Sequence, residues 1–246
     1  MKTLWPVLLI CLAAALSVNV ATATPARGPG GLEAADKAPD NAKEPARTSR
    51  DAAARDPNDP NDLWWKKWDI IAKDPNDPNE LLRTKWDALA GVLQNKDLDQ
   101  KTKEKIIDKI VSPIFDFPLM AKLALGKTHW PKLSDPQREK FTSLFTERLK
   151  ASYREKITLY KDEKLLFKPA VHKDKTTIQI PTELISEGKK VAIVYRLRKL
   201  EKRWMIYDVE IQGVSILLTY LSQFDDILQH GTVEDLLARL AEPPTT

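Results

Sequence analysis

Apolar residues recur every three to four positions through the middle of the chain, a spacing that predicts amphipathic helices. In the clearest case Ile106, Ile107 and Ile110 share one side of a predicted helix. That helix is expected over residues 103–115, with a break at Pro113 because proline lacks the backbone N–H that the helix needs. Further helices are expected over residues 77–93, 118–126 and 134–160.

The pattern changes to alternation of apolar and polar residues after residue 160, which predicts strands. Turns at 187–190 and 199–202 join the later strands into antiparallel hairpins. The expected strands cover residues 165–171, 176–182, 191–199 and 203–211, and two helices over 214–229 and 232–240 follow. The predicted fold class is therefore α+β, with an antiparallel sheet of about four strands packed by helices from both ends of the chain.

Two nearly continuous apolar runs stand out from this pattern. Residues 114–126 carry only Asp116 and Lys122 as charged side chains, and residues 213–221 carry none. We expect these runs and the sheet to enclose an apolar cavity that is the functional site. The alternative is a solid core, because composition alone is compatible with either interior.

Residues 56–73 and 74–91 are two copies of one pattern, and each opens with Asp-Pro-Asn-Asp-Pro-Asn. Alternating carboxylates and amides of this kind are typical of calcium loops. Neither copy has the glycine of a tight calcium loop or its distal glutamate, so we interpret the opening as a helix start. In the second copy Asp77 fits the N-cap, Pro78 the first helical position and Glu80 the third.

The first copy, residues 56–73, is then a duplicated helical extension that precedes the domain. Its Trp64, Trp65 and Trp68 need a contact partner. The alternatives are the domain itself, a membrane surface or another protein.

Residues 1–23 have the pattern of a secretory signal peptide, with Lys2 followed by an apolar segment over 4–20 and small residues up to Ala23. A transmembrane anchor is the alternative, and the short apolar segment without a following basic cluster argues against it. Cys11 does not fit a lipoprotein signal, because a small residue would precede it and Ile10 is not small.

Residues 24–55 contain almost no large apolar side chain, which predicts a disordered linker. Removal of residues 1–23 leaves a chain without cysteine. Disulfides, thiolate catalysis and metal sites built from cysteine are thereby excluded.

The chain shows no constellation of residues typical of catalysis or metal binding. His129, His172 and His230 lie far apart in the sequence and are expected to be surface or capping residues. Asp208 and Glu210 are expected to be a surface pair near a strand end. The formal net charge is +4 with basic and acidic residues interspersed, so we expect a solvated surface and no nucleic-acid partner. We predict neither an enzyme nor a metal site.

Two long motifs remain, one made of residues 115–126, Trp130, 136–138 and 141–145, the other of residues 207–215, Tyr220 and 222–224. In this order they resemble the toluene-tolerance family, the periplasmic phospholipid-binding components of the bacterial lipid-asymmetry transport system. The resemblance covers about residues 77–241, and Leu221 departs from it because the family often carries arginine there. If that arginine contacts a headgroup or a partner in the family, the contact is altered at Leu221. Gly231 and residues 236–237 also match the C-terminal end of the family.

The resemblance implies that residues 74–242 form a lipid-binding domain, and that the protein is a periplasmic carrier holding phospholipid as cargo, without a cofactor. It implies two partners, an inner-membrane ABC transporter complex and an outer-membrane lipoprotein complex. A carrier of hopanoid or another lipid, and a non-catalytic periplasmic adapter between proteins, are the alternatives. We select residues expected to line the cavity by combining membership of the matching motifs with a predicted position on the inward face of a helix or strand. They are Phe117, Met120, Leu123, Phe141, Leu144, Phe145, Ile193, Tyr195, Ile206, Val214, Leu217, Leu218 and Phe224.

Overall fold

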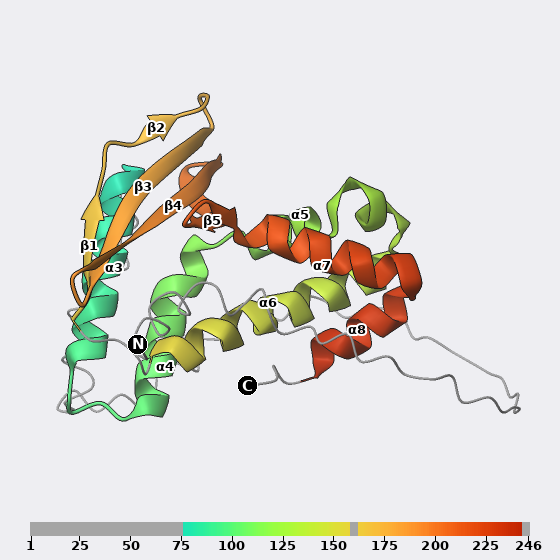
Figure 1. Cartoon of the computed structure of the whole chain (residues 1–246), viewed down its shortest axis with the longest axis horizontal. Helices are drawn as coiled ribbons and strands as arrows, with labels where there is room; N and C mark the ends of the chain where they lie inside the picture. The colour runs from blue at the N-terminus through green and yellow to red at the C-terminus, as the bar shows by residue number, and fades with distance from the viewer. Residues whose placement is uncertain (1–75, 158–161, 243–246) are drawn as a thin grey trace, which may run out of the picture. The chain divides into compact units, whose positions relative to one another are not determined.

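The computed structural model describes residues 76–157 and 162–242 of the chain. The predicted signal peptide (1–23), linker (24–55) and helical extension (56–73) lie outside the described residues. Within the described part, helices precede and follow an antiparallel sheet, which confirms the α+β class (Figure 1). No helix among the described residues is both long and apolar enough to cross a membrane.

Two capped helices open the described part, α3 (Pro78–Gln94) and α4 (Gln100–Val111). The predicted helix start at Asp77 is confirmed, because its carboxylate accepts hydrogen bonds from the backbone N–H groups of Asn79 and Glu80 at 2.7 and 3.0 Å. Helix α4 ends before the predicted residue 115. A 3-10 turn, η2 (Ser112–Ile114), takes over where Pro113 interrupts the α-helical hydrogen bonds.

The middle helices are α5 (Phe117–His129) and α6 (Asp135–Ile157), joined through the 3-10 turn η3 (Trp130–Lys132). Helix α5 bends at Gly126, whose φ of 66° lies in the left-handed region that favours glycine.

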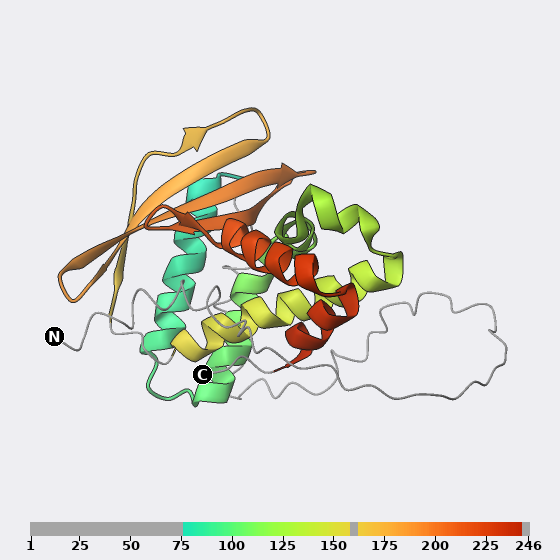
Figure 2. The same ribbon diagram turned by 45° about the vertical axis from the view of Figure 1, so that its right-hand side comes forward.

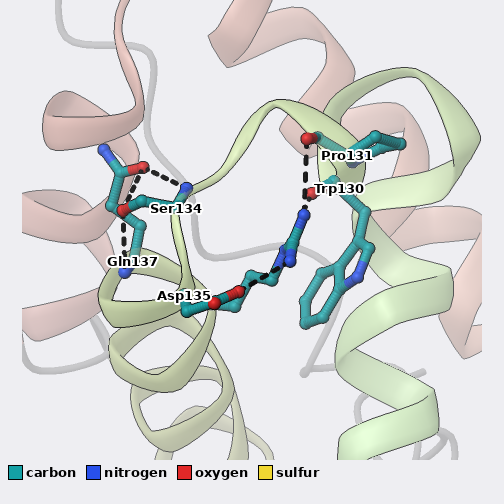
Figure 3. A network of polar contacts seen from close by, with 6 residues as sticks. Trp130, Pro131, Ser134, Asp135 and Gln137 are labelled. Carbon is teal, nitrogen blue, oxygen red and sulfur yellow. Dashed lines mark hydrogen bonds and ion pairs between the residues drawn. The ribbon is translucent and has the colours of Figure 1, made fainter.

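Helix α6 begins at the predicted capping box (Figure 3). The Gln137 backbone N–H donates to Ser134 Oγ at 3.4 Å, and the Ser134 backbone N–H donates to Gln137 Oε1 at 2.8 Å. Arg138 ties this start to the preceding turn by donating to the backbone oxygens of Trp130 and Pro131, each at 3.3 Å. The reciprocal hydrogen bonds explain why the sequence placed this helix start correctly.

The sheet has six strands instead of the predicted four or so, in the order β1-β3-β4-β5-β6, with β2 also paired to β3. All the paired strands are antiparallel. The strands are β1 (Lys164–Phe167), β2 (Val171–His172), β3 (Thr177–Ser186), β4 (Lys189–Leu200), β5 (Arg203–Ile211) and β6 (Val214–Ser215).

The predicted strand 165–171 is divided into β1 and β2. Pro181 of β3 faces the interruption, and Lys168 donates its backbone N–H to the Pro181 oxygen at 2.9 Å. Pro181 cannot return a hydrogen bond, and Pro169 cannot donate one either. Two prolines on facing segments therefore interrupt the ladder at this point.

Strand β5 contains one residue more than the segment of β4 that it pairs with. Arg196 faces Asp208 and Leu197 faces Ile206, which leaves Tyr207 as a bulge. The strand changes its buried face at this point, because burial alternates up to Ile206 and then includes both Asp208 and Val209.

The chain ends in α7 (Ile216–His230) and α8 (Val233–Ala241). The predicted start of α7 at Val214 is two residues early, because Val214 and Ser215 pair with β5 as strand β6. Ser215 is instead the N-cap and accepts a hydrogen bond from the Leu218 backbone N–H at 3.1 Å. The predicted Thr232–Asp235 capping box of α8 is confirmed.

Helix α3 packs along β1 and covers one face of the sheet, as both views show (Figures 1 and 2). Helices α5, α6, α7 and α8 instead pack on one another, and α7 begins where β5 and β6 end. The domain therefore has a sheet layer with one covering helix and a neighbouring group of helices.

Candidate functional site

The apolar interior consists of two adjoining clusters. We call the cluster between the helices the helical core; its buried residues are Met120, Ala121, Ala124, Leu125, Leu133, Phe141, Phe145, Leu217, Tyr220, Phe224, Ile227, Leu236, Leu237 and Leu240. We call the cluster beneath α3 the sheet core; its buried residues are Leu81, Leu82, Ile114, Ile178, Ile180, Leu184, Val191, Ile193, Leu197, Trp204, Ile206, Val209 and Ile211.

Aromatic rings form the centre of the helical core. Phe141 and Phe145 of α6 stack with ring centroids 5.7 Å apart. Phe224 of α7 meets Phe141 edge to face at 5.5 Å, and Tyr220 meets Phe145 edge to face at 5.1 Å. These are the favourable arrangements of aromatic pairs, so they hold α6 and α7 together.

Two half-buried side chains connect the clusters. Phe115 and Ile216 each pack against both the helical core and the sheet core. Phe115 also forms a parallel bridge to Ile206 of β5. Phe115 lies just before α5 and Ile216 is the first residue of α7, so both helices begin where the two cores meet.

The structure divides the predicted lining residues into three groups. Those in the helical core are Met120, Phe141, Phe145, Leu217 and Phe224, with Phe117 and Leu144 half-buried against it. Those in the sheet core are Ile193 and Ile206, with Tyr195 half-buried against it. The remaining three, Leu123, Val214 and Leu218, are exposed by 39%, 49% and 62% and contribute to neither cluster.

A groove of about 460 Å³ lies between α3 and β1. Its apolar side chains include Trp86, Leu165 and Phe167, which also pack against the sheet core. The groove therefore gives access to the edge of that core. Its full lining is Arg83, Trp86, Asp87, Ala90, Gln94, Asp162, Glu163, Lys164, Leu165, Leu166 and Phe167.

Basic, acidic and uncharged polar side chains all line the groove. The Arg83 guanidinium lies 4.4 Å from the centroid of the Phe167 ring. Gln94 Nε2 donates to Asp162 Oδ1 at 3.2 Å. The sequence prediction missed this groove, although the alternation of Leu165 and Phe167 along β1 was a signal for its apolar wall.

A buried ion pair fixes the joint between the sheet and α5. The Asp116 carboxylate is 4% exposed and lies 2.5 Å from Arg198 Nη2 of β4. Asp116 also caps α5 by accepting from the Leu119 backbone N–H at 3.1 Å, and its own N–H donates to the Ile206 oxygen at 2.8 Å. One residue therefore holds the helix start, the charge pair and the sheet edge together.

A second carboxylate fixes the start of α7, and it corrects a prediction. Asp208 was expected on the surface with Glu210, but it is buried and accepts hydrogen bonds from Ser215 Oγ at 2.7 Å and from the Leu217 backbone N–H at 3.3 Å. Burial raises the pKa of Asp208, although these hydrogen bonds and the nearby Arg196 oppose the rise. Glu210 instead pairs with Arg196 at 2.5 Å.

The histidines are placed differently from one another. His129, expected on the surface, is buried, with Nε2 2.7 Å from Asp225 Oδ1 of α7. His172 and His230 are exposed, as expected. Among residues 76–157 and 162–242 no group of three or more His, Cys, Asp or Glu side chains is arranged to hold a metal ion.

Comparison with known proteins identifies a family and a similar solved structure. Residues 83–242 match the model of the MlaC protein family. A phospholipid-binding protein from Ralstonia solanacearum, solved in complex with a phospholipid, has a similar structure with a TM-score of 0.58. That chain is 24% identical, and the match covers 65% of this chain and 92% of the other.

Proposed function

Because this chain belongs to the MlaC family of periplasmic, non-catalytic phospholipid-binding carriers, we propose that it carries lipid between two membrane complexes. Its partners in this proposal are an inner-membrane ABC transporter complex and an outer-membrane lipoprotein complex. It receives a phospholipid at one and delivers it at the other.

The need for a carrier follows from the cost of exposing lipid chains to water. Moving the acyl chains of a phospholipid with about thirty methylenes into water costs on the order of 24 kcal/mol of free energy, at about 0.8 kcal/mol per methylene. A protein that supplies equivalent apolar contacts removes most of this barrier. Such a protein is expected to discriminate little between different acyl chains, because methylenes form no hydrogen bonds that could distinguish one chain from another.

We place the acyl chains at the boundary of the two cores. The observation that supports this placement is that Phe115 and Ile216 are half-buried and contact both clusters. Acyl chains that reach this boundary meet apolar side chains on both sides. On the helical side these are Phe117, Met120, Phe141, Leu144, Phe145, Leu217 and Phe224, and on the sheet side Ile193, Tyr195 and Ile206.

We place the headgroup at the groove between α3 and β1. Its apolar side chains Trp86, Leu165 and Phe167 are continuous with the sheet core, so a chain can pass inward from it. Its rim carries cationic Arg83 and anionic Asp87. Side chains of both signs suit the headgroup of a phospholipid, which always includes a phosphate.

Native mass spectrometry of the protein purified from the periplasm tests the cargo. We expect a mass that exceeds the chain by one phospholipid, and lipid extraction then separates a phospholipid from a hopanoid. A chain without bound lipid after gentle purification contradicts the proposal.

Substitutions test the placement of the acyl chains. Leu144→Arg and Leu217→Arg place a charge among the apolar contacts and should lower lipid occupancy. Leu200→Arg is the matched control, because Leu200 is 44% exposed and belongs to neither core. A Leu144→Arg protein with native circular dichroism and full lipid occupancy rules out this placement.

A further inference from the structure

Helices α5 and α7 start together at the sheet and run side by side in the same direction. Phe115, just before α5, bridges to Ile206 of β5, and β6, just before α7, pairs with the same strand. Further along, a Cβ atom on Gly126 would lie 2.6 Å from Leu221, and His129 meets Asp225. Residue numbers on both helices therefore increase together along their contact.

Helical periodicity then defines an apolar seam at the surface. Positions three and seven residues before Gly126 face the same side of α5, and the position three residues before Leu221 faces the same side of α7 as Leu221 does. We call these residues, together with the exposed Val214 of β6 just ahead of α7, the α5–α7 seam: Leu119, Leu123, Val214, Leu218 and Leu221. The seam holds three of the largest exposed apolar side chains among the described residues, Leu123, Val214 and Leu218.

On α5 and on α7 before Asp225, the acidic and basic side chains are of one sign. Lys122 and Lys127 on α5 are exposed. Helix α5 contains no Asp or Glu, and α7 contains none before Asp225. The Asp225 carboxylate is bonded to His129 and Gln229. The seam is thus an aliphatic strip with lysines beside it, complementary to an anionic apolar surface.

The composition of the seam favours a lipid surface over a protein partner. Protein interfaces are enriched in aromatic residues, methionine and arginine, and are depleted in lysine. The seam has leucine and valine as its apolar residues and lysine as its cation. Amphipathic helices that lie in the membrane interface combine apolar residues and lysine in this way.

We propose that the α5–α7 seam docks the protein on the surface of an anionic phospholipid bilayer. Leu123, Val214 and Leu218 enter the boundary between headgroups and acyl chains, and Lys122 and Lys127 contact the lipid phosphates. This assigns the three exposed residues of the predicted cavity lining to the membrane instead. The docking does not depend on which lipid the interior holds.

Sedimentation with vesicles tests the apolar part of this proposal. The protein purified from the periplasm should bind vesicles of phosphatidylcholine and phosphatidylglycerol more tightly than vesicles of phosphatidylcholine alone. Leu123 and Leu218 are 39% and 62% exposed, so together they offer the membrane about as much apolar surface as one fully exposed leucine. Replacing both with serine (Leu123→Ser and Leu218→Ser) should therefore weaken binding roughly tenfold to a hundredfold. The control combines Val171→Ser and Leu200→Ser, each 44% exposed elsewhere on the sheet, and should bind as the wild type does.

The lysines give an independent readout. Lys122→Gln combined with Lys127→Gln should weaken binding to the anionic vesicles about thirtyfold, at about fivefold per lysine, and leave binding to neutral vesicles unchanged. Lys101→Gln combined with Lys189→Gln, both exposed on other elements, is the control.

Four results would overturn the docking proposal. In the first, the wild type does not bind anionic vesicles. In the second, the variant with Leu123→Ser and Leu218→Ser loses no more binding than the control variant with Val171→Ser and Leu200→Ser. In the third, the Leu123→Ser and Leu218→Ser protein loses its co-purified lipid in native mass spectrometry, which places the seam in the cargo site. In the fourth, that protein binds vesicles normally but no longer binds an isolated partner complex, which makes the seam a protein interface. Full cargo occupancy with weakened vesicle binding supports the proposal.

Discussion

Gly126 of α5 lies directly against Leu221 of α7, so closely that a Cβ atom at residue 126 would come within 2.6 Å of Leu221 Cδ1. Gly126 also has φ 66° and ψ −175°, a region that is essentially restricted to glycine. The bend of α5 and its close approach to α7 therefore both depend on the missing side chain.

Gly126→Ala should lower the free energy of unfolding by about 1–3 kcal/mol from backbone strain, with a further loss from the contact with Leu221. Adding Leu221→Ala relieves the contact and leaves the strain, so the double variant should recover part of the loss. Urea unfolding of both single variants and the double variant measures this coupling. Strictly additive effects would show that Leu221 does not limit the approach at Gly126.

Asp116→Ala should cost about 2–4 kcal/mol of stability, because it removes the charge-assisted hydrogen bond to the one-third exposed Arg198 and leaves α5 without its cap. Asp99→Ala is the matched control, since Asp99 caps α4 from an exposed position and should cost only about 1 kcal/mol. Thermal or urea unfolding checks both variants. Equal losses would mean that the Asp116–Arg198 pair adds nothing beyond capping.

Asp208→Asn should change the dependence of stability on pH. Burial raises the folded-state pKa of Asp208, so the folded protein holds this proton more tightly than the unfolded chain does. The contribution of Asp208 to stability therefore falls as pH rises from its ordinary pKa through the raised one. Urea unfolding across this range should show a fall for the wild type that Asp208→Asn lacks. Parallel curves for the two proteins would contradict the assignment.

Asp225→Asn should make the protein less sensitive to acid. The hydrogen bond from His129 lowers the pKa of Asp225, so this carboxylate stabilises the fold above its ordinary pKa, and the stabilisation is lost as pH falls through the lowered value. Unfolding midpoints at neutral and strongly acidic pH test this. The exposed Asp226→Asn is the control, and a wild-type acid response in Asp225→Asn would exclude the contribution.

Local hydrogen-bonding patterns made much of the fold predictable. The starts of α3, α6 and α8 were correctly placed because Asp77, Ser134 and Thr232 satisfy backbone groups within their own turn. The antiparallel hairpins followed from alternation and turn residues in the same way. Such signals need no information from distant parts of the chain.

The errors arose where distant segments decide the outcome. The start of α7 shifts to Ser215 because Val214 and Ser215 pair with β5, which the apolar run itself does not reveal. Asp208 is buried because Ser215 and Leu217 come to it from the next element.

The candidate site shows the same limit. The helical spacing of apolar residues correctly predicted that Met120 and Phe141 point inward. The same spacing also selected Leu218, which is exposed because no further element covers that side of α7 among the described residues. The groove between α3 and β1 was missed because its walls are far apart in the sequence. Which element covers which face is a property of tertiary packing.

The extra residue at Tyr207 makes the length of β5 as important as its composition. Ile206 and Val209 are three positions apart yet both lie in the sheet core, because the bulge takes up one residue between them; in a regular strand, positions three apart face opposite sides. The hairpin turn at Glu187 and Gly188, by contrast, is exposed and has room to change. A codon lost from β5 outside the bulge would therefore turn the residues beyond it to the opposite face of the sheet, whereas a codon added at the exposed turn would leave the buried faces of both strands in place.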